Sequence, residues 1–307
     1  MAAMRKQNHL IRFFPLYTMM IPGLIYLLIN NYLPMFGLVI AFKKVNFRLG
    51  IFKSPWVGFE NFRYLFLTPD AFVITRNTIL YNLVFIAANA VVGILIALML
   101  NEVRSRFAKS VYQNLILLPH LISMVIVSYL VYAFLSMDTG MINRSILRVF
   151  GKEPVLWYQA KQHWPYILVF VQTWKGFGFG AVIYLSSIVG ISRDYYEAAY
   201  LDGAGKFKQI WHITLPLIRP TIVILTLLAV GRMFYSDFGL FYQVPLNQGM
   251  LYDVTNVIDT YVYRSLLVLG DLGMSSAAGF YQSIVGFICI LAANMAVRKI
   301  EPSSSLF

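Results

Sequence analysis

The sequence has few charged residues and almost no cysteine, and each shortage excludes a class of protein. Only 12% of its 307 residues are charged, whereas 59% are hydrophobic. A soluble domain of this length has no interior large enough for so much apolar side chain. The single cysteine, Cys289, excludes an internal disulfide framework and is expected to pack in the core. The chain is therefore expected to use a lipid bilayer as its solvent.

Patterns that carry catalytic chemistry are also missing. The sequence has no GxxxxGK[ST] stretch that would cradle nucleotide phosphates, its four histidines lack metal-ligand spacing, and its acidic residues form no catalytic pair. The glycine run 176–180 lacks the strand and the third-glycine spacing of a dinucleotide site, and in an apolar helix its small residues permit close helix packing. We predict no enzymatic activity, no metal site and no cofactor bound by this chain.

The net charge of +12 raises the question of nucleic acid as a partner. The basic residues are scattered between apolar stretches instead of being gathered on a soluble face. Anionic lipid headgroups therefore explain the charge better, and no nucleic acid is expected.

Six apolar stretches are long enough to cross a bilayer, whose core needs about 20 residues per helix. Their approximate ranges are 14–42, 79–100, 111–135, 165–191, 221–244 and 276–297. The first is interrupted by Asn30, Asn31 and Pro34, where we expect a bend or an exit from the bilayer, and Pro119 is expected to kink the third. The prediction is an all-α integral membrane protein with one domain, residues 1–307.

An even number of spans puts both termini on the same side of the membrane. With the termini inside, the inner segments hold 12 Lys and Arg residues and the outer segments hold 11, but the inner segments are shorter. The higher basic density favours cytoplasmic termini. The aromatic outer loop Phe47–Phe66 is expected to lie among the headgroups.

A polar insert, residues 194–216, interrupts the apolar pattern on the predicted inner side. Asp194 and Glu197 have capping-box spacing, which predicts a helix through Tyr200. Gly203 can take the left-handed conformation that ends this helix.

A second short helix is predicted from Gly205 until Pro216. Phe207, Ile210, Trp211 and Thr214 fall on one side of it, at i, i+3, i+4 and i+7. An apolar stripe outside the bilayer must pack on its own bundle, on the membrane surface or on another protein.

The insert resembles the EAA loop of the membrane subunits of binding-protein-dependent ABC importers. The resemblance implies a cytoplasmic coupling helix that docks in a groove on a separate ATPase subunit. The residues that match the loop, including the DGA of the carbohydrate branch, are Glu197, Ala198, Ala199, Asp202, Gly203, Ala204, Ile213, Leu215 and Pro216. Glu197 is expected to hold the corner through its cap or an ion pair.

Three further stretches, Tyr32–Lys43, Trp174–Ile191 and Asn256–Arg264, are similar to the maltose-permease-like branch of the same family. The resemblance implies a type I importer permease of the bacterial inner membrane that carries oligosaccharides or polysaccharide fragments. Its implied partners are a second homologous permease, an external solute-binding protein and two ATPase subunits that hold ATP and Mg. A peptide or amino-acid importer, which shares the loop, and a secondary transporter are the alternatives.

Charges inside the spans suggest where a substrate path lies. Lys175 and Arg232 are expected near mid-bilayer, and Asp237 follows; such charges usually face a cavity or a partner charge. Either they line the path, or Arg232 and Asp237 neutralise each other. The candidate path residues are Gln172, Trp174, Lys175, Arg232, Tyr235, Asp237, Tyr281 and Gln282. The excess of basic residues outside fits either uronic-acid oligomers or lipid.

Overall fold

The computed structural model describes residues 13–300, and this part of the chain is helical with no β-strand and one isolated β-bridge, between Lys43 and Trp56. The predicted all-α class is confirmed. Five helical segments are long and apolar enough to cross a membrane, and a bent pair adds a sixth if it counts as one span. The segments are Phe14–Phe42, Pro69–Glu102, Lys161–Val189, Lys206–Val230 and Leu272–Lys299, and the bent pair is Arg106–Leu121 with Met124–Leu135.

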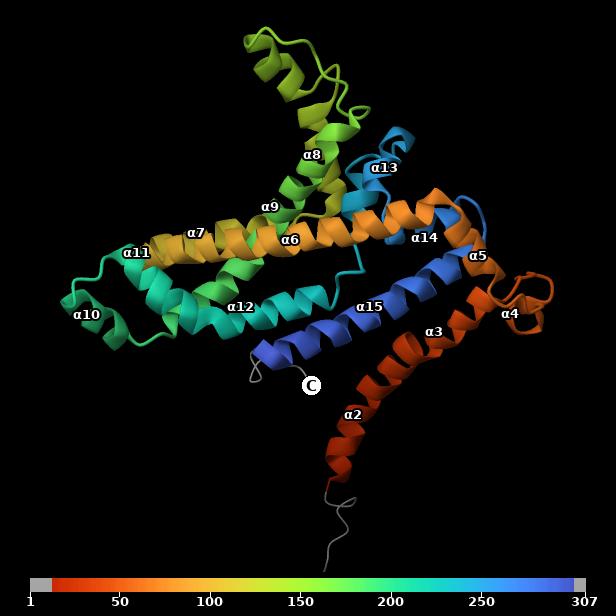
Figure 1. Cartoon of the computed structure of the whole chain (residues 1–307), viewed down its shortest axis with the longest axis horizontal. Helices are drawn as coiled ribbons and strands as arrows, with labels where there is room; N and C mark the ends of the chain where they lie inside the picture. The colour runs from red at the N-terminus through yellow and green to blue at the C-terminus, as the bar shows by residue number, and fades with distance from the viewer. Residues whose placement is uncertain (1–12, 301–307) are drawn as a thin grey trace, which may run out of the picture.

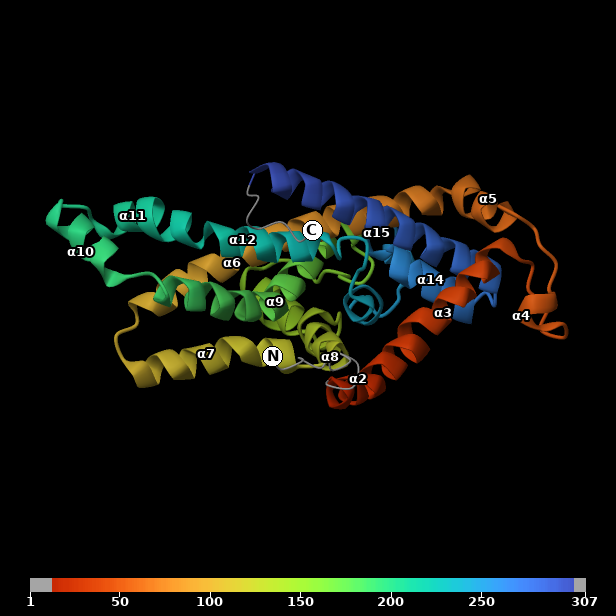
Figure 2. The same cartoon turned by 90° about the horizontal axis from the view of Figure 1, so that it is seen from below.

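Four long helices form the body of the molecule (Figure 1), and they are α6 (Pro69–Glu102), α9 (Trp164–Val189), α12 (Leu215–Val230) and α15 (Leu272–Ile300). The α6–α9 contact is the most extensive between helices, and α12 touches α6, α9 and α15. Figure 2 shows the same bundle from below, with the loop around α10 (Arg193–Leu201) at one end and α5 (Glu60–Leu67) at the other.

Glycines let the helices around α9 approach closely, as predicted for the glycine run. A Cβ at Gly178 would lie 2.0 Å from the backbone oxygen of Ile116, in α7 (Arg106–Leu121). A Cβ at Gly176 would lie 2.5 Å from Oδ1 of Asn89 on α6. Because membrane helices lack a hydrophobic drive to associate, such close backbone contact is a main source of their packing energy.

The first span stays helical where an interruption was expected. It consists of α2 (Phe14–Leu27), a π-helical turn η1 (Leu28–Tyr32), α3 (Leu33–Met35) and a 3₁₀ stretch η2 (Phe36–Phe42). The π-turn widens the helix around Asn30 and Asn31 so that the chain needs no loop there. No residue of α2 is buried, and the helix extends away from the bundle (Figure 1).

The third predicted span, 111–135, bends close to Pro119, as expected, but so sharply that it forms two helices. It is α7 followed by α8 (Met124–Leu135), bent by 92° at the break between them. The break lies after Pro119, at Ile122 and Ser123, both with extended backbone. Ser123 Oγ accepts from the amide of Ile126 and so caps the new helix. Beyond α8, the segment that leads to α9 holds η3 (Ile142–Leu147) and η4 (Lys161–His163).

The predicted fifth span, 221–244, is displaced, and Pro216 does not stop a helix. One continuous helix, Lys206–Val230, runs through α11 (Lys206–Gln209), η5 (Ile210–Thr214) and α12. Pro216 sits in the first turn of α12, directly after the π-turn η5, where the changed hydrogen-bond spacing accommodates its missing N–H. After Val230 the chain is irregular until η6 (Gly239–Gln243).

The remaining short elements lie in the segments between the long helices, and they are α4 (Gly50–Lys53), η7 (Gly249–Leu251), α13 (Tyr252–Thr255) and α14 (Ile258–Leu267). The loop around α4 is held by Lys43, which is only 3% exposed and donates to the carbonyl oxygens of Ile51 and Phe52. Its aromatic side chains point outward, with Phe52 82% exposed. The headgroup location of this loop stays a prediction.

Candidate functional site

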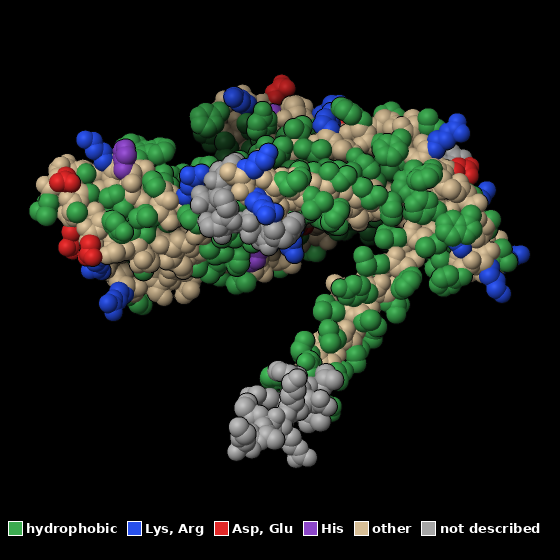
Figure 3. Space-filling view, turned by 60° about the horizontal axis from the view of Figure 1, so that its bottom comes forward, with side chains coloured by type: hydrophobic (Ala, Val, Ile, Leu, Met, Phe, Trp, Pro, Cys, Tyr) green, Lys and Arg blue, Asp and Glu red, His purple; other side chains and the backbone are tan. Residues whose placement is uncertain are grey.

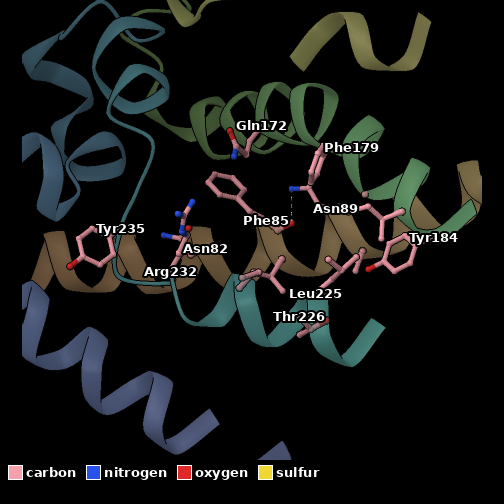
Figure 4. A pocket seen from close by; sticks show the side chains of 15 residues that line it. Asn82, Phe85, Asn89, Gln172, Phe179, Tyr184, Leu225, Thr226, Arg232 and Tyr235 are labelled. Carbon is pink, nitrogen blue, oxygen red and sulfur yellow. Dashed lines mark hydrogen bonds between the residues drawn. The ribbon is translucent and has the colours of Figure 1, made fainter. Parts of the chain in front are cut away.

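A cavity of about 290 Å³ opens where α6, α9 and α12 meet the irregular segment after α12. Figure 4 shows Arg232 beside Asn82, and Gln172 projecting from α9. Its lining residues are Asn82, Phe85, Ile86, Asn89, Ala90, Gln172, Phe179, Gly180, Ile183, Tyr184, Leu225, Thr226, Ala229, Arg232 and Tyr235. Most of this wall is apolar, and its polar groups are amides, hydroxyls and one guanidinium.

Arg232 was predicted to lie within the fifth helix. In the structure it lies two residues past the end of α12, outside a helix. The helix ends at Val230, and Arg232 then enters a turn in which its carbonyl accepts from the amide of Tyr235. The Arg232 side chain is exposed, and no hydrogen bond or ion pair of its guanidinium occurs among residues 13–300.

The segment that carries Arg232 is held rigidly from behind. Phe234 is 2% exposed, and its carbonyl accepts from Nε2 of Gln282 at 2.6 Å. Asp259 receives Nε2 of the same Gln282 at 3.1 Å and the amide of Ser236 at 2.7 Å. Burial raises the pKa of Asp259, and the two donated hydrogen bonds oppose that rise. Gln282, a predicted path residue, is therefore a buried support of the segment.

Lys175 supports the bend between α7 and α8 and does not line the cavity. Its Nζ donates to the carbonyl oxygen of Ile122 at 2.6 Å and to that of His120 at 3.2 Å, with the oxygen of Pro119 at 3.5 Å. A cation at a helix C-terminus satisfies carbonyls that the helix leaves unpaired. Its neighbour Trp174 packs against the apolar cluster that contains Val171.

The alternative that Arg232 and Asp237 neutralise each other is not seen. Within the described residues the ion pairs are Lys161–Asp253 and Lys206–Glu102. Asp237 instead accepts from the amide of Leu240 and so begins η6. Tyr281, outside the cavity, shares a hydrogen bond with Thr75.

Of the eight predicted path residues, the structure brings together Gln172, Arg232 and Tyr235 at the cavity. Sequence reasoning missed Asn82 and Asn89, both on α6. The two lie seven residues apart, which puts them on the same helix face, and polar residues on one face of an apolar span were a usable signal.

A second feature, the exposed elbow, is formed by residues 193–209 at the end of the bundle. The predicted cap is wrong: Ser192, not Asp194, caps α10, by accepting from the amide of Asp194. Glu197 is exposed and forms neither a cap nor one of the ion pairs found in residues 13–300. The helix ends before Gly203, whose φ of +79° is the left-handed conformation predicted.

Backbone bonds fix the turn of the elbow. The amide of Gly203 donates to the carbonyl of Tyr200, and the amide of Ala204 donates to that of Ala199. Together these two bonds are a Schellman motif, which closes a helix end tightly. Lys206 then pairs with Glu102 at the end of α6 at 2.8 Å, and the elbow is tied to the bundle.

The outer side of the elbow is apolar and exposed. Leu201 is 85% exposed and Tyr200 is 76% exposed. Both line a depression of about 750 Å³, together with Glu197 and Gly203 among others. The other residues of the predicted coupling set, Ile213, Leu215 and Pro216, lie on the continuous helix that follows. Figure 3 shows hydrophobic side chains over the first span, and charged side chains at the elbow end and around α4 and α5.

Comparisons with known proteins agree over most of the chain. Residues 89–302 match the family described as "Binding-protein-dependent transport system inner membrane component". The protein LplB of Bacillus subtilis (strain 168) is 37% identical over 93% of this chain and 89% of its own length. The polygalacturonan/rhamnogalacturonan transport system permease protein YteP of the same organism is 38% identical over 92% of this chain and 88% of its own length.

Two solved structures to which this chain is similar are also transport proteins. A chain of a bacterial ABC transporter involved in the import of the acidic polysaccharide alginate superposes with a TM-score of 0.86 and 34% identity, covering 95% of this chain and 98% of that one. A chain of a bacterial alginate ABC transporter in complex with an alginate pentasaccharide-bound periplasmic protein superposes with a TM-score of 0.85 and 34% identity, covering 95% and 96%.

Proposed function

We propose that this chain, which belongs to the family of binding-protein-dependent transport system inner membrane components, forms half of the path by which an ABC importer moves oligosaccharides or polysaccharide fragments. The family consists of transport subunits and not of enzymes. In the proposed importer, an external solute-binding protein delivers the substrate to this chain. In this proposal the energy comes from ATP and Mg held by two separate ATPase subunits.

Carbohydrate is the substrate class that the relatives favour. Their names specify polygalacturonan and rhamnogalacturonan, arabino-oligosaccharides and alginate. These names give no support to a peptide or amino-acid importer, and relatives named as ABC transporters argue against a secondary transporter.

The observation that carries the coupling is the shape of the exposed elbow. A helix of nine residues ends in a Schellman turn at Gly203 and presents Tyr200 and Leu201 outside the bundle. Exposed apolar side chains on a rigid support are what a partner's groove can bury. We infer that the elbow seats in the ATPase subunit, which would place it and both termini in the cytoplasm. A second, homologous permease would cover the unburied first span and complete the path.

Cysteine cross-linking tests the coupling. In a Cys289→Ala background, Leu201→Cys is expected to cross-link to the ATPase subunit of the assembled importer. Val149→Cys is the matched control, because Val149 is 82% exposed but lies in the loop between α8 and α9. Equal cross-linking at both positions would remove the coupling role. Uptake that continues on an ion gradient without the ATPase would refute the importer mechanism itself.

A further inference from the structure

We propose that Arg232 binds the carboxylate of an acidic sugar unit in the cavity between α6, α9 and α12, so that this permease selects uronic-acid oligosaccharides. The inference rests on the proposed carbohydrate transport and goes further, by assigning the charge of the substrate and the residue that reads it.

The charge of the cavity supports an anionic ligand. Of the residues that line it, Arg232 is the one Lys or Arg, and none is Asp or Glu. The nearest acidic residue along the chain, Asp237, accepts from the amide of Leu240 and forms no ion pair within residues 13–300. The exposed Arg232 guanidinium thus presents at the cavity wall a positive charge that no residue of 13–300 neutralises. A carboxylate brought by the substrate would pair with that charge while it is bound.

The chemistry of the guanidinium suits a carboxylate better than a neutral hydroxyl. Its planar donors pair with the two oxygens of a carboxylate in bidentate geometry. Arg232 has this freedom because none of its donors is used by another residue within the described part of the chain.

Neighbouring groups provide what the rest of a sugar ring needs. Gln172 has no hydrogen-bond partner among residues 13–300, and Asn82 uses its amide nitrogen on Thr78 and Ser236, which leaves its oxygen to accept from a hydroxyl. Tyr235 and Phe179 add aromatic side chains to the same wall, and both are more than half exposed. At about 290 Å³ the cavity fits a sugar unit and not a whole oligosaccharide.

The backbone that carries Arg232 is already organised before a ligand arrives. The buried ring of Phe234 and the hydrogen bonds from Gln282 to the Phe234 carbonyl and to Asp259 hold the segment from behind. The backbone at Arg232 therefore needs no reordering, and this lowers the entropy cost of binding.

The experiment measures uptake by the complete importer in cells. The probes are labelled tri-galacturonate, an alginate trisaccharide and the methyl ester of each, because esterification removes the charge and leaves the sugar. The variants are Arg232→Gln, Arg232→Lys and the control Arg148→Gln, an exposed arginine of the loop between α8 and α9. The binding protein is the same in every strain, so its own selectivity cancels when each variant is divided by the wild type.

We expect Arg232→Gln to lower uptake of the acidic probes by roughly 10- to 100-fold, the loss of a charge-assisted hydrogen bond. Arg232→Lys should keep part of that uptake, and the control and the amount of assembled complex should stay at wild-type values. Ester uptake, where the wild type shows it, should change less than threefold.

Equal losses for acid and ester, no loss for either, or a Lys variant as poor as the Gln variant would overturn the inference and leave carbohydrate transport intact. Wild-type cells that import none of the four probes but do import neutral oligosaccharides would also overturn it. Failure to import any oligosaccharide with ATP would instead refute the proposed function.

Discussion

Replacing Lys175 by Met tests whether this lysine stabilises the bend between α7 and α8 or takes part in transport. Its Nζ lies within 3.2 Å of two carbonyl oxygens at the break, those of His120 and Ile122. A hydrogen bond to a charged group contributes about 1.5–3 kcal/mol when its loss leaves a partner unsatisfied. Lys175 is only partly shielded from solvent, so its two hydrogen bonds should not contribute their full sum. We therefore expect Lys175→Met to lower the free energy of unfolding by about 2–3 kcal/mol.

A second lysine provides the control for this experiment. Lys161 pairs with Asp253 at 2.6 Å, but the two side chains are 57% and 67% exposed. Exposed ion pairs contribute about 0–1 kcal/mol despite good geometry, so Lys161→Met should have little effect. The contacts of Lys175 with neutral carbonyl groups at the bend are thus expected to contribute more stability than the exposed ion pair of Lys161 with a carboxylate.

The assay is the thermal midpoint of the purified importer, read from the monodisperse peak that survives heating. Lys175→Met should lower the midpoint by about 4–12 °C, on the scale of about 2–4 °C per kcal/mol for large chains, and Lys161→Met by about 4 °C or less. Equal midpoints with uptake lost only in Lys175→Met would refute the reasoning. They would mean that Lys175 acts on the substrate.

Two further substitutions test the close packing and the elbow. Gly178→Ala should lower the yield of folded protein, because its Cβ would lie 2.0 Å from a backbone oxygen of α7. The control Gly180→Ala should be tolerated, because the nearest atom to its Cβ would be 3.7 Å away. Equal yields would contradict the packing argument. Gly203→Val should cost about 1–2 kcal/mol of stability, because φ is +79° there, and should uncouple ATP hydrolysis from uptake. The control Gly205→Ala, at φ −68°, should keep both the stability and the coupling. A Gly203→Val variant that stays coupled would show that the turn is dispensable.

Element type was predictable from the sequence because apolar length is a strong signal. The ranges 79–100, 165–191 and 276–297 each fall almost wholly within a helix of the structure. The glycine at 203 was equally readable, since few residues other than glycine take a left-handed turn at a helix end.

Helix ends and the size of proline effects were not predictable in the same way, although Pro119 did indicate a bend near the break between α7 and α8. Hydropathy does not distinguish a straight span from α7 and α8, because the 92° break changes direction without changing composition. Pro216 predicted an end, but a π-turn before it supplies the altered bonding that a proline needs. Such a turn depends on tertiary packing and has no residue signature of its own.

The site was only partly readable for a related reason. Residue type shows that Lys175, Gln282 and Arg232 are costly in a bilayer, but it does not show what each touches. The first donates to carbonyls at a bend, the second supports a backbone segment, and the third faces the cavity. Three similar-looking residues therefore have three different surroundings, and only their neighbours tell them apart.

The continuous helix Lys206–Val230 has a mechanical consequence. One end is the pivot beside Gly203, and the other ends two residues before Arg232. Its 25 residues make a lever of about 37 Å at 1.5 Å per residue, so a tilt of only about 5° displaces the far end by roughly 3 Å. A small rotation at the elbow would therefore move the end of the helix next to Arg232 by about the length of a hydrogen bond. Such a displacement is large enough to break one hydrogen bond to a substrate and allow another to form.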